Sequence, residues 1–266
     1  DDGYRNNITH ALPILRCYRA PATFFVPTGF VDQPRPFWFD RLDYAVQHNP
    51  TRHAELRLGE FAAQLDYTNR ETLRASYIRS ARTAVKQSVS DTRFRKEMNH
   101  MAVVLERQLG HGLADIQRDD DWTAIMTWNQ VVELDPMEVA IGSHTVDHIR
   151  LGHVDANVAR EQLAASKAAI ELRTGRPCQS VSYPNGSFSD ETTALAREAC
   201  YVCALTTIEG LNTVGDDVMR LKRIGVPIDV TSADLLSRVN GFSMFLSRVF
   251  RKRRKRPVER QTPSIA

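Results

Sequence analysis

Hydrophobic residues fall into two alternating patterns along most of this chain: short continuous runs and longer stretches with helical spacing. The runs at residues 22–26, 137–142 and 181–183 contain β-branched or aromatic side chains and are followed by turn or polar residues, which is typical of buried strands. The same criteria predict helices at about residues 5–20, 128–134, 156–174 and 189–199, and strands near 201–206 and 220–226.

Capping residues mark the ends of two of these helices. Thr127 and Gln130 have the spacing of a capping box, in which each side chain bonds to the backbone of the other residue. Asp155 precedes a clear amphipathic stretch, and Gly175 follows its last apolar turn. We therefore predict a short helix after Thr127 and a long one between Asp155 and Gly175.

Strands that alternate with helices pair in parallel, so the pattern predicts an α/β fold. In such folds the functional side chains lie at the carboxyl ends of the strands. His144 follows one predicted strand, and the turn Pro184-Asn185-Gly186 follows another. Asp2 is expected at a third strand end. Because nothing precedes Asp1 in this sequence, we interpret the expected first strand as truncated.

Residues 40–121 interrupt the alternation. They are rich in Arg, Glu, Gln and Ala, and apolar positions such as Leu56, Phe61 and Leu65 have helical spacing, so we predict several inserted helices. The expected organisation is one domain over residues 1–237, insertion included, followed by an amphipathic and basic tail over 238–266.

The positive charge is concentrated in this tail. Arg248 and the run 251–256 carry seven positive charges, so the net charge of +3 becomes 3 − 7 = −4 without them. A basic run after an amphipathic stretch suits an anionic membrane surface, which makes peripheral membrane contact one expectation and a helix packed on the domain the other. Basic and aromatic residues are not interleaved on any predicted element, which argues against nucleic acid as a partner.

Composition and cysteine usage indicate an ordinary globular protein. Hydrophobic residues make up 42% and charged residues 25%, and no apolar run reaches the roughly 18 residues of a transmembrane helix. The cysteines have no disulfide spacing, and we interpret the pair Cys200-x-x-Cys203 as two small core residues. A cytoplasmic location, with membrane association through the tail, is therefore expected. A targeting segment removed from the start stays open, because the chain begins with Asp-Asp-Gly instead of Met.

Two adjacent carboxylates and two imidazoles carry the candidate chemistry. Asp1 and Asp2 open the chain, and His144 and His148 lie four residues apart. One carboxylate with two histidines is the usual protein share of a catalytic divalent-metal site, and residues four apart can reach one ion from one face of a turn or helix. We therefore interpret Asp2, His144 and His148 as metal ligands. Asp1 is then the base beside the metal, which predicts a hydrolase.

Three segments resemble the first three motifs of the polysaccharide deacetylase family, also known as the NodB homology group or carbohydrate esterase family 4. They are Asp1-Asp2-Gly3, residues 143–148 and residues 182–186, and they occur in the family's order. The resemblance covers about residues 1–30 and 122–228. It implies a distorted (β/α) barrel of about seven strands that removes N-acetyl, in some members O-acetyl, groups from sugars.

The resemblance also implies roles for individual residues. Asp1 matches the catalytic base of the family, and Asp2, His144 and His148 match its metal ligands. The turn of the third motif offers a backbone N–H to the oxyanion, here that of Asn185, so that a metal and a preorganised amide both face the developing charge. Zinc suits this ligand set best, and cobalt or nickel would also fit. The expected substrate is an N-acetylated oligo- or polysaccharide.

Two positions depart from the family pattern. Ser182 stands where many members have an arginine that holds the base, and no histidine follows His153 to protonate the leaving amine. Arg223 lies where the family's last histidine is expected; it stays protonated and cannot readily donate a proton. It can instead replace the missing arginine beside Asp1. The proton donor is left open, with Asp1 as one candidate.

Two further interpretations stay open from the sequence. A non-catalytic carbohydrate-binding module on the same scaffold is the alternative to an enzyme, because the histidine acid is missing. Phe37-Trp38-Phe39 could form a stacking platform for a sugar ring, although an aromatic cluster is more often core. His153 is expected to be an ordinary surface histidine.

Overall fold

The computed structural model describes residues 1–48, 53–58, 61–66, 90–110, 112–116, 121–134, 137–227 and 229–242. The longer elements in chain order are α1 (Leu12–Tyr18), β1 (Ala22–Val26), α2 (Thr28–Asp32), α3 (Trp38–His48), β2 (His53–Leu58), β3 (Phe61–Asp66), α5 (Asp91–Leu109), α6 (Leu113–Ile116), α7 (Trp128–Val132), β4 (Val139–Ser143), α8 (Ala156–Thr174), β5 (Ser180–Ser182), α9 (Asp190–Glu198), β6 (Cys203–Glu209), β7 (Leu221–Arg223) and α10 (Ser232–Val239). A π-helical turn, η1 (Asn7–Ala11), precedes α1, and 3-10 turns lie at η3 (Leu151–His153), η4 (Pro184–Gly186) and η5 (Val218–Arg220).

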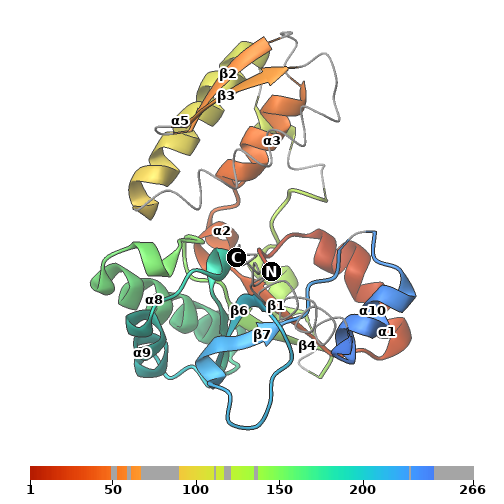
Figure 1. The fold of residues 1–266 in the computed structure, drawn as a ribbon. Helices are drawn as coiled ribbons and strands as arrows, with labels where there is room; N and C mark the ends of the chain where they lie inside the picture. Colours follow the sequence, from red (N-terminus) through yellow and green to blue (C-terminus); the bar gives the residue numbers. More distant parts are fainter. Residues whose placement is uncertain are drawn as a thin grey trace, which may run out of the picture.

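A five-stranded parallel sheet forms the centre of the molecule. Its strand order is β1-β4-β5-β6-β7, and every neighbouring pair is parallel. In Figure 1, α8 and α9 lie on one side of this sheet, and α1 and α10 lie on the other. The predicted α/β fold with parallel pairing is therefore confirmed, because a helix connects most of its successive strands.

The sheet curls so that its two edge strands approach each other. The Arg223 guanidinium at the end of β7 lies 5.5 Å from the ring centre of Phe25 in β1, although three strands separate these edges in the sheet order. In the described residues no strand pairs β7 with β1, so a closed barrel and the expected seven strands are not confirmed. The curl nevertheless brings the ends of β1 and β7 to one place.

The predicted helix caps are confirmed. Thr127 and Gln130 form both bonds of the capping box at the start of α7. The side chain of Asp155 accepts a hydrogen bond from the backbone N–H of Asn157, and α8 ends at Gly175 with a φ of +66°. These ends depend on local backbone hydrogen bonds, which is why the sequence alone locates them well.

The core lies between the sheet and its helices. Val26 of β1, Val181 of β5, Ala204 of β6 and Leu163 of α8 are fully buried within one continuous hydrophobic cluster. This core contains a buried pair of hydroxyls, since those of Ser143 and Ser166 lie 2.6 Å apart. This contact joins α8 to the end of β4, which is followed by the candidate metal ligands.

The inserted segment contains several helices as predicted, but it also contains a hairpin, so the expected helical structure around Leu56, Phe61 and Leu65 is wrong. It consists of α3, the antiparallel pair β2 and β3, α5 and α6, and it stands above the sheet in Figure 1. Leu56 lies in β2, and Phe61 and Leu65 lie in β3. Residues 53–58 alternate apolar and polar side chains, and only two residues, one of them glycine, connect the strands; this was the missed hairpin signal.

Two smaller expectations also change. Cys200 is exposed at a left-handed position before β6, and Cys203 is half-buried, so they are not a pair of core residues. The expected boundary after residue 237 falls inside α10. The rest of the tail, residues 243–266, lies outside the described residues.

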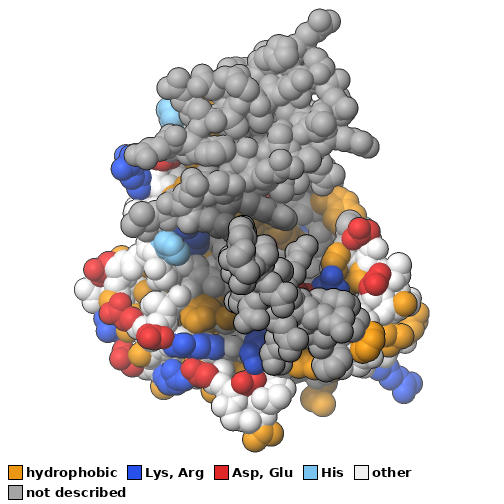
Figure 2. All heavy atoms as spheres, in the orientation of Figure 1, with side chains coloured by type: hydrophobic (Ala, Val, Ile, Leu, Met, Phe, Trp, Pro, Cys, Tyr) orange, Lys and Arg blue, Asp and Glu red, His pale blue; other side chains and the backbone are white. Residues whose placement is uncertain are grey.

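Hydrophobic side chains are exposed beside the start of this tail. Leu236 and Val239 of α10 and Ile14 and Tyr18 of α1 are exposed, and Figure 2 shows orange side chains on the side where Figure 1 places these helices. None of the described helices is both long and apolar enough to cross a membrane.

Burial within α8 gives a direct test of the core. Leu163 is fully buried, so Leu163→Ala should lower the free energy of unfolding by about 2–5 kcal/mol. Leu172 of the same helix is 84% exposed, and Leu172→Ala should change that free energy by no more than about 0.5 kcal/mol. Urea denaturation of both variants measures the difference. Equal losses would contradict this placement of α8.

Candidate metal and catalytic site

The carboxyl ends of the parallel strands define the site. β4 ends at Ser143, β5 at Ser182 and β7 at Arg223. The backbone N–H of His144 donates to the carbonyl of Val26 at the end of β1, at 3.0 Å. Because parallel strands present their carboxyl ends at one edge of the sheet, the side chains that follow them converge.

The first residues of the chain cross this edge. The carbonyl of Gly3 accepts a hydrogen bond from the backbone N–H of Met126 at 2.9 Å, and a Cβ at Gly3 would lie 3.2 Å from Pro27. The chain start is therefore held between the end of β1 and the segment before α7. This places Asp1 and Asp2 beside the residues that follow β4 and β5.

Asp2, His144 and His148 meet as the sequence predicts. Asp2 Oδ1 lies 3.0 Å from His148 Nε2 and 3.3 Å from His144 Nε2. Both histidines are buried, and one ligand atom from each of the three residues lies within 4.8 Å of the others. Across the part of the chain that the structure describes, this is the one group of acidic, histidine or cysteine side chains with such an arrangement.

The hydrogen bonding of this cluster fits a cation. His144 Nδ1 lies 2.7 Å from the carbonyl oxygen of Ser182, and because a carbonyl can only accept, Nδ1 carries the proton. In neutral His144 the lone pair of Nε2 therefore faces Asp2. Asp2 Oδ1 is buried and receives no well-aligned hydrogen bond from any described residue. Electron-rich atoms gathered in this way are the donor set of a divalent metal.

The electrostatics of the cluster keep its ligands ready for a metal. Burial by itself raises the pKa of the Asp2 carboxyl, but hydrogen bonds and charge from the two imidazoles in their protonated forms outweigh it and hold this pKa well below its usual range. Burial, with a smaller effect from the neighbouring His144, lowers the pKa of His148. A carboxylate and a neutral imidazole are the forms that bind metal ions.

Left-handed backbone conformations are concentrated in the site. Among the described residues, six other than glycine have positive φ, and four of them are Asp2 (+69°), Thr145 (+66°), His148 (+54°) and Asn185 (+54°). Each such conformation costs on the order of 1–3 kcal/mol and persists only where the surroundings impose it. The backbone here is shaped by the site and not by local preference.

Aromatic rings just before and within α3 contact His148. The ring centres of Phe37 and Phe39 lie 5.2 and 5.7 Å from that of His148, and the two phenylalanine rings stack at 4.8 Å. Phe37 is only 1% exposed and belongs to the core, so it cannot form a platform for a sugar ring. Instead, its ring packs edge-on against the buried ring of His148.

Arg223 forms a two-bond contact with Asp1. Its Nη1 and Nη2 atoms lie 2.6 and 2.9 Å from the two carboxylate oxygens of Asp1. Nη2 also donates to the Ser182 hydroxyl at 2.8 Å, and that hydroxyl lies 3.4 Å from Asp1. The expected contact between Arg223 and Asp1 is therefore present. The serine that replaces the family's arginine bonds to both partners.

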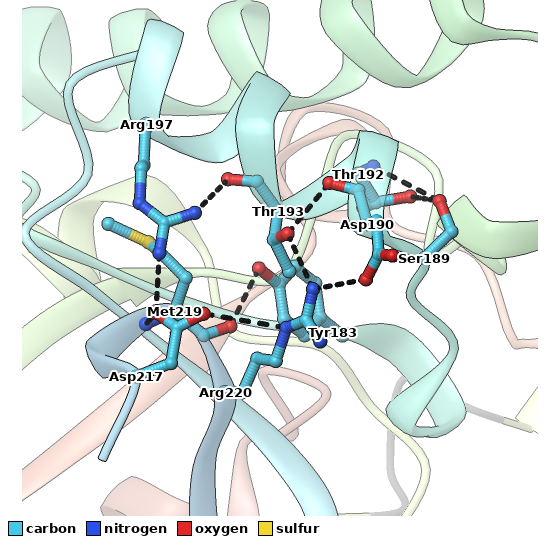
Figure 3. A network of polar contacts seen from close by, with 9 residues as sticks. All are labelled: Tyr183, Ser189, Asp190, Thr192, Thr193, Arg197, Asp217, Met219 and Arg220. Atoms are coloured by element: carbon cyan, nitrogen blue, oxygen red, sulfur yellow. Dashed lines mark hydrogen bonds and ion pairs between the residues drawn. The ribbon is translucent and has the colours of Figure 1, made fainter. Parts of the chain in front are cut away.

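A polar network holds the start of β7, which carries Arg223. Figure 3 shows Arg197 of α9 pointing toward Asp217, and Arg220 between Asp190 and Thr193 of α9. The hydroxyl of Tyr183 donates to the carbonyl of Met219 at 3.1 Å. These contacts fasten η5 to α9 and to the end of β5, so that the strand after η5 aims Arg223 at Asp1.

The Pro184-Asn185-Gly186 turn presents a free amide. Asn185 is left-handed and exposed, and its N–H has no acceptor among the described residues, whereas the Tyr183 N–H bonds to Leu205. Gly186 also has positive φ, and a Cβ there would lie 2.0 Å from Thr207 Oγ1. The turn therefore needs glycine at 186 to keep Asn185 in place.

Two side-chain contacts near the site were not expected from the sequence. The Tyr4 hydroxyl donates to Asp40 of α3 at 2.7 Å, and burial raises the pKa of Tyr4. His153 is not an unpartnered surface residue, because its Nδ1 lies 2.9 Å from the Ser187 hydroxyl. Tyr4 follows directly after Asp-Asp-Gly, but nothing local indicates which acid it meets.

The fold and this site define an α/β protein with a candidate metal site, and a family comparison gives the assignment. The family model described as polysaccharide deacetylase matches residues 1–204, which is more than half of the chain. This protein therefore belongs to the polysaccharide deacetylase family. The match includes all three segments that resemble the family's motifs, and it ends before Arg223.

Relatives support the same assignment. A Bacillus subtilis (strain 168) protein, YxkH, named as a polysaccharide deacetylase, is 27% identical over 101 residues, which cover 38% of this chain and 36% of YxkH. The aligned part is thus about a third of that relative. The Streptococcus pyogenes deacetylase PplD, solved in complex with acetate, has a TM-score of 0.54 at 17% identity over 90% of this chain and 67% of PplD.

A second solved structure gives a similar result. A de-N-acetylase from Aggregatibacter actinomycetemcomitans has a TM-score of 0.51 at 15% identity, over 89% of this chain and 72% of that one. At these identities the likeness establishes a shared fold.

The tight approach at Gly186 yields a test of the turn. Gly186→Ala should lower the free energy of unfolding by about 1–3 kcal/mol, because the new methyl group overlaps Thr207. Gly225→Ala is the control: its Cβ would meet nothing within 4 Å, and the change should stay within about 0.5 kcal/mol. Urea denaturation measures both. A neutral Gly186→Ala would mean that the turn does not approach Thr207 as described.

Proposed function

We propose that this protein is a metal-dependent hydrolase that removes N-acetyl groups from carbohydrate. The observation that carries the proposal is the meeting of two charge clusters at one sheet edge. Asp2 contacts His144 and His148, while the adjacent Asp1 is held by Arg223. Membership of the polysaccharide deacetylase family supports the reaction class.

Asp2, His144 and His148 would hold the metal ion. When bound there, a divalent cation polarises the acetyl carbonyl and increases the acidity of a water molecule. Two imidazoles and one carboxylate favour zinc, with cobalt or nickel as close alternatives. The bond from His144 Nδ1 to Ser182 fixes the orientation of its imidazole, as expected for a metal ligand.

Asp1 acts as the base in this proposal. It takes one proton from water while the water oxygen forms a bond to the acetyl carbon. Arg223 keeps the carboxylate ionised and fixed through its two bonds, and Ser182 adds a third contact. The Asn185 N–H donates a hydrogen bond to the carbonyl oxygen as negative charge develops on it.

The same proton then goes to the leaving nitrogen. No histidine follows His153 in the chain, so the acid used by many family members is missing. Protonated Asp1 is the remaining group beside the reacting atoms, and it returns its proton to the nitrogen as the carbon–nitrogen bond breaks. The products are acetic acid, which ionises to acetate in solution, and an amine on the sugar, and Asp1 is ionised again.

Acetate release from N-acetylated and O-acetylated oligosaccharides tests the proposal. The protein should release acetate from N-acetylated substrates with zinc, lose this activity with a chelator, and regain it when zinc is restored. Binding of the same oligosaccharides without any acetate release, with each metal supplied, would favour the alternative of a non-catalytic carbohydrate-binding module.

The role of Asp1 gives a sharper prediction. Asp1→Asn keeps the shape of the side chain but not its basicity, so turnover should fall by about 10²–10⁴-fold. Zinc affinity, measured by calorimetry on the same preparation, should stay unchanged because Asp1 is not a ligand. One residue placed ahead of Asp1 keeps a free α-amino group out of the site. Wild-type turnover in this variant would refute the assignment.

The ligand set is tested through metal binding alone. His148→Ala removes one of three ligands and should abolish tight zinc binding, since two ligands rarely hold the ion. His153→Ala is the matched control, because His153 bonds to Ser187 and lies outside the cluster. Calorimetry should therefore show loss of affinity in the first variant only. Equal affinities in the two variants would rule out this site.

A further inference from the structure

A buried ion pair joins the inserted segment to the loop that carries the histidines. Arg150 Nε lies 2.6 Å from Asp91 Oδ1, and the two side chains are only 4% and 3% exposed. Arg150 belongs to the loop of residues 144–150, here called the metal loop. Asp91 is the first residue of α5, whose N-terminus favours a carboxylate. Neither residue lies in the three segments that resemble the family's motifs.

Aromatic packing encloses this pair. The Arg150 guanidinium lies 5.2 Å from the ring centre of Phe94, one turn after Asp91 in α5. Phe94 in turn packs edge-on against Trp38 of α3, with ring centres 5.4 Å apart. Helices α3 and α5 of the inserted segment therefore take part in holding one side chain of the metal loop.

Arg150 is only two residues from His148. His148 has a φ of +54°, a conformation that its surroundings must impose. Phe37 and Phe39 contact its ring, and the Arg150–Asp91 pair holds the backbone that follows it. The inserted segment thus touches His148 through its ring and through its chain.

A gain in folding stability does not by itself explain why the Arg150–Asp91 ion pair is buried. Burying two charges costs desolvation that their attraction often fails to exceed, and well-packed apolar residues in their place are often as stable. Asp91 Oδ2 is moreover buried without a hydrogen-bond partner among the described residues. A buried carboxylate oxygen without a hydrogen-bond partner lowers the free energy of unfolding further. The pair is therefore better explained by a role in positioning Arg150 than by a gain in stability.

We propose that Asp91 is a positioning residue for the metal site: it fixes Arg150, and thereby the backbone that sets the direction of His148 Nε2. The inserted segment then contributes to metal affinity through Asp91. This inference rests on the metal ligands in the proposed function, but it concerns metal affinity and not turnover.

The test separates positioning from stability by removing both charges. In the double variant Asp91→Leu with Arg150→Met, no unpaired buried charge remains, so the protein should unfold at a urea concentration close to that of the wild type. Its Co²⁺ and Zn²⁺ affinities, measured by chelator competition, should nevertheless fall about 10–100-fold. The absorption spectrum of bound Co²⁺ should change as well, because it reports ligand geometry.

Arg41→Met with Glu106→Leu is the matched control. This pair is also largely shielded and joins α3 to α5, but it has no described contact with the metal loop. Its variant should bind Co²⁺ with wild-type affinity and spectrum. If the double variant folds poorly, Arg150→Lys replaces it: the charge is kept, the guanidinium fork is lost, and affinity should fall about tenfold.

The outcomes are distinct. Wild-type Co²⁺ affinity and spectrum in the folded Asp91→Leu/Arg150→Met protein, or in Arg150→Lys, would overturn the positioning role while leaving the proposed function intact. Equal losses in the Arg41/Glu106 control would also overturn it, because the effect would then be general. Failure of the wild-type protein itself to bind Co²⁺ or Zn²⁺ would instead refute the metal site of the proposed function, and this inference with it.

Discussion

The structure depends on holding three electron-rich atoms together in a buried place. Asp2 Oδ1 and the Nε2 atoms of His144 and His148 lie within contact distance at the carboxyl edge of the sheet. Atoms of this kind repel one another unless a proton or a cation lies between them. Their approach therefore has to be imposed by the surrounding fold, and the left-handed backbone at Asp2 and His148 shows where it is imposed.

Two different parts of the chain share this task. The strands bring the ligands to one edge, and the bond from His144 to the carbonyl of Ser182 sets one imidazole from β5. The other imidazole contacts Phe39 of α3, in the inserted segment, and the preceding Phe37. A site built from two layers in this way buries both imidazoles while leaving Asp1 and Asn185 exposed.

The partner of Asp1 shows how a site tolerates the loss of a residue. Many family members are expected to have an arginine at the position of Ser182, and here Arg223 comes from a strand two places further along the sheet. Curling of the sheet brings β7 close enough for both guanidinium nitrogens to reach the carboxylate. The positive charge beside Asp1 is thus supplied from another element, and the Ser182 hydroxyl bonds to both residues.

The sequence by itself determined what depends on neighbouring residues: the capping box at Thr127, the ends of α8, the alternation of strands and helices, and the spacing of His144 and His148. The residue types themselves predicted Asp2, His144 and His148 as metal ligands, and the resemblance to a family added the idea that Arg223 meets Asp1. Tertiary structure decided the rest. The hairpin at residues 53–66 was missed because short apolar runs fit both helical and strand spacing. The pairs Tyr4–Asp40 and Arg150–Asp91 join residues 36 and 59 positions apart, and no local pattern specifies which charges meet across such distances once the chain has folded.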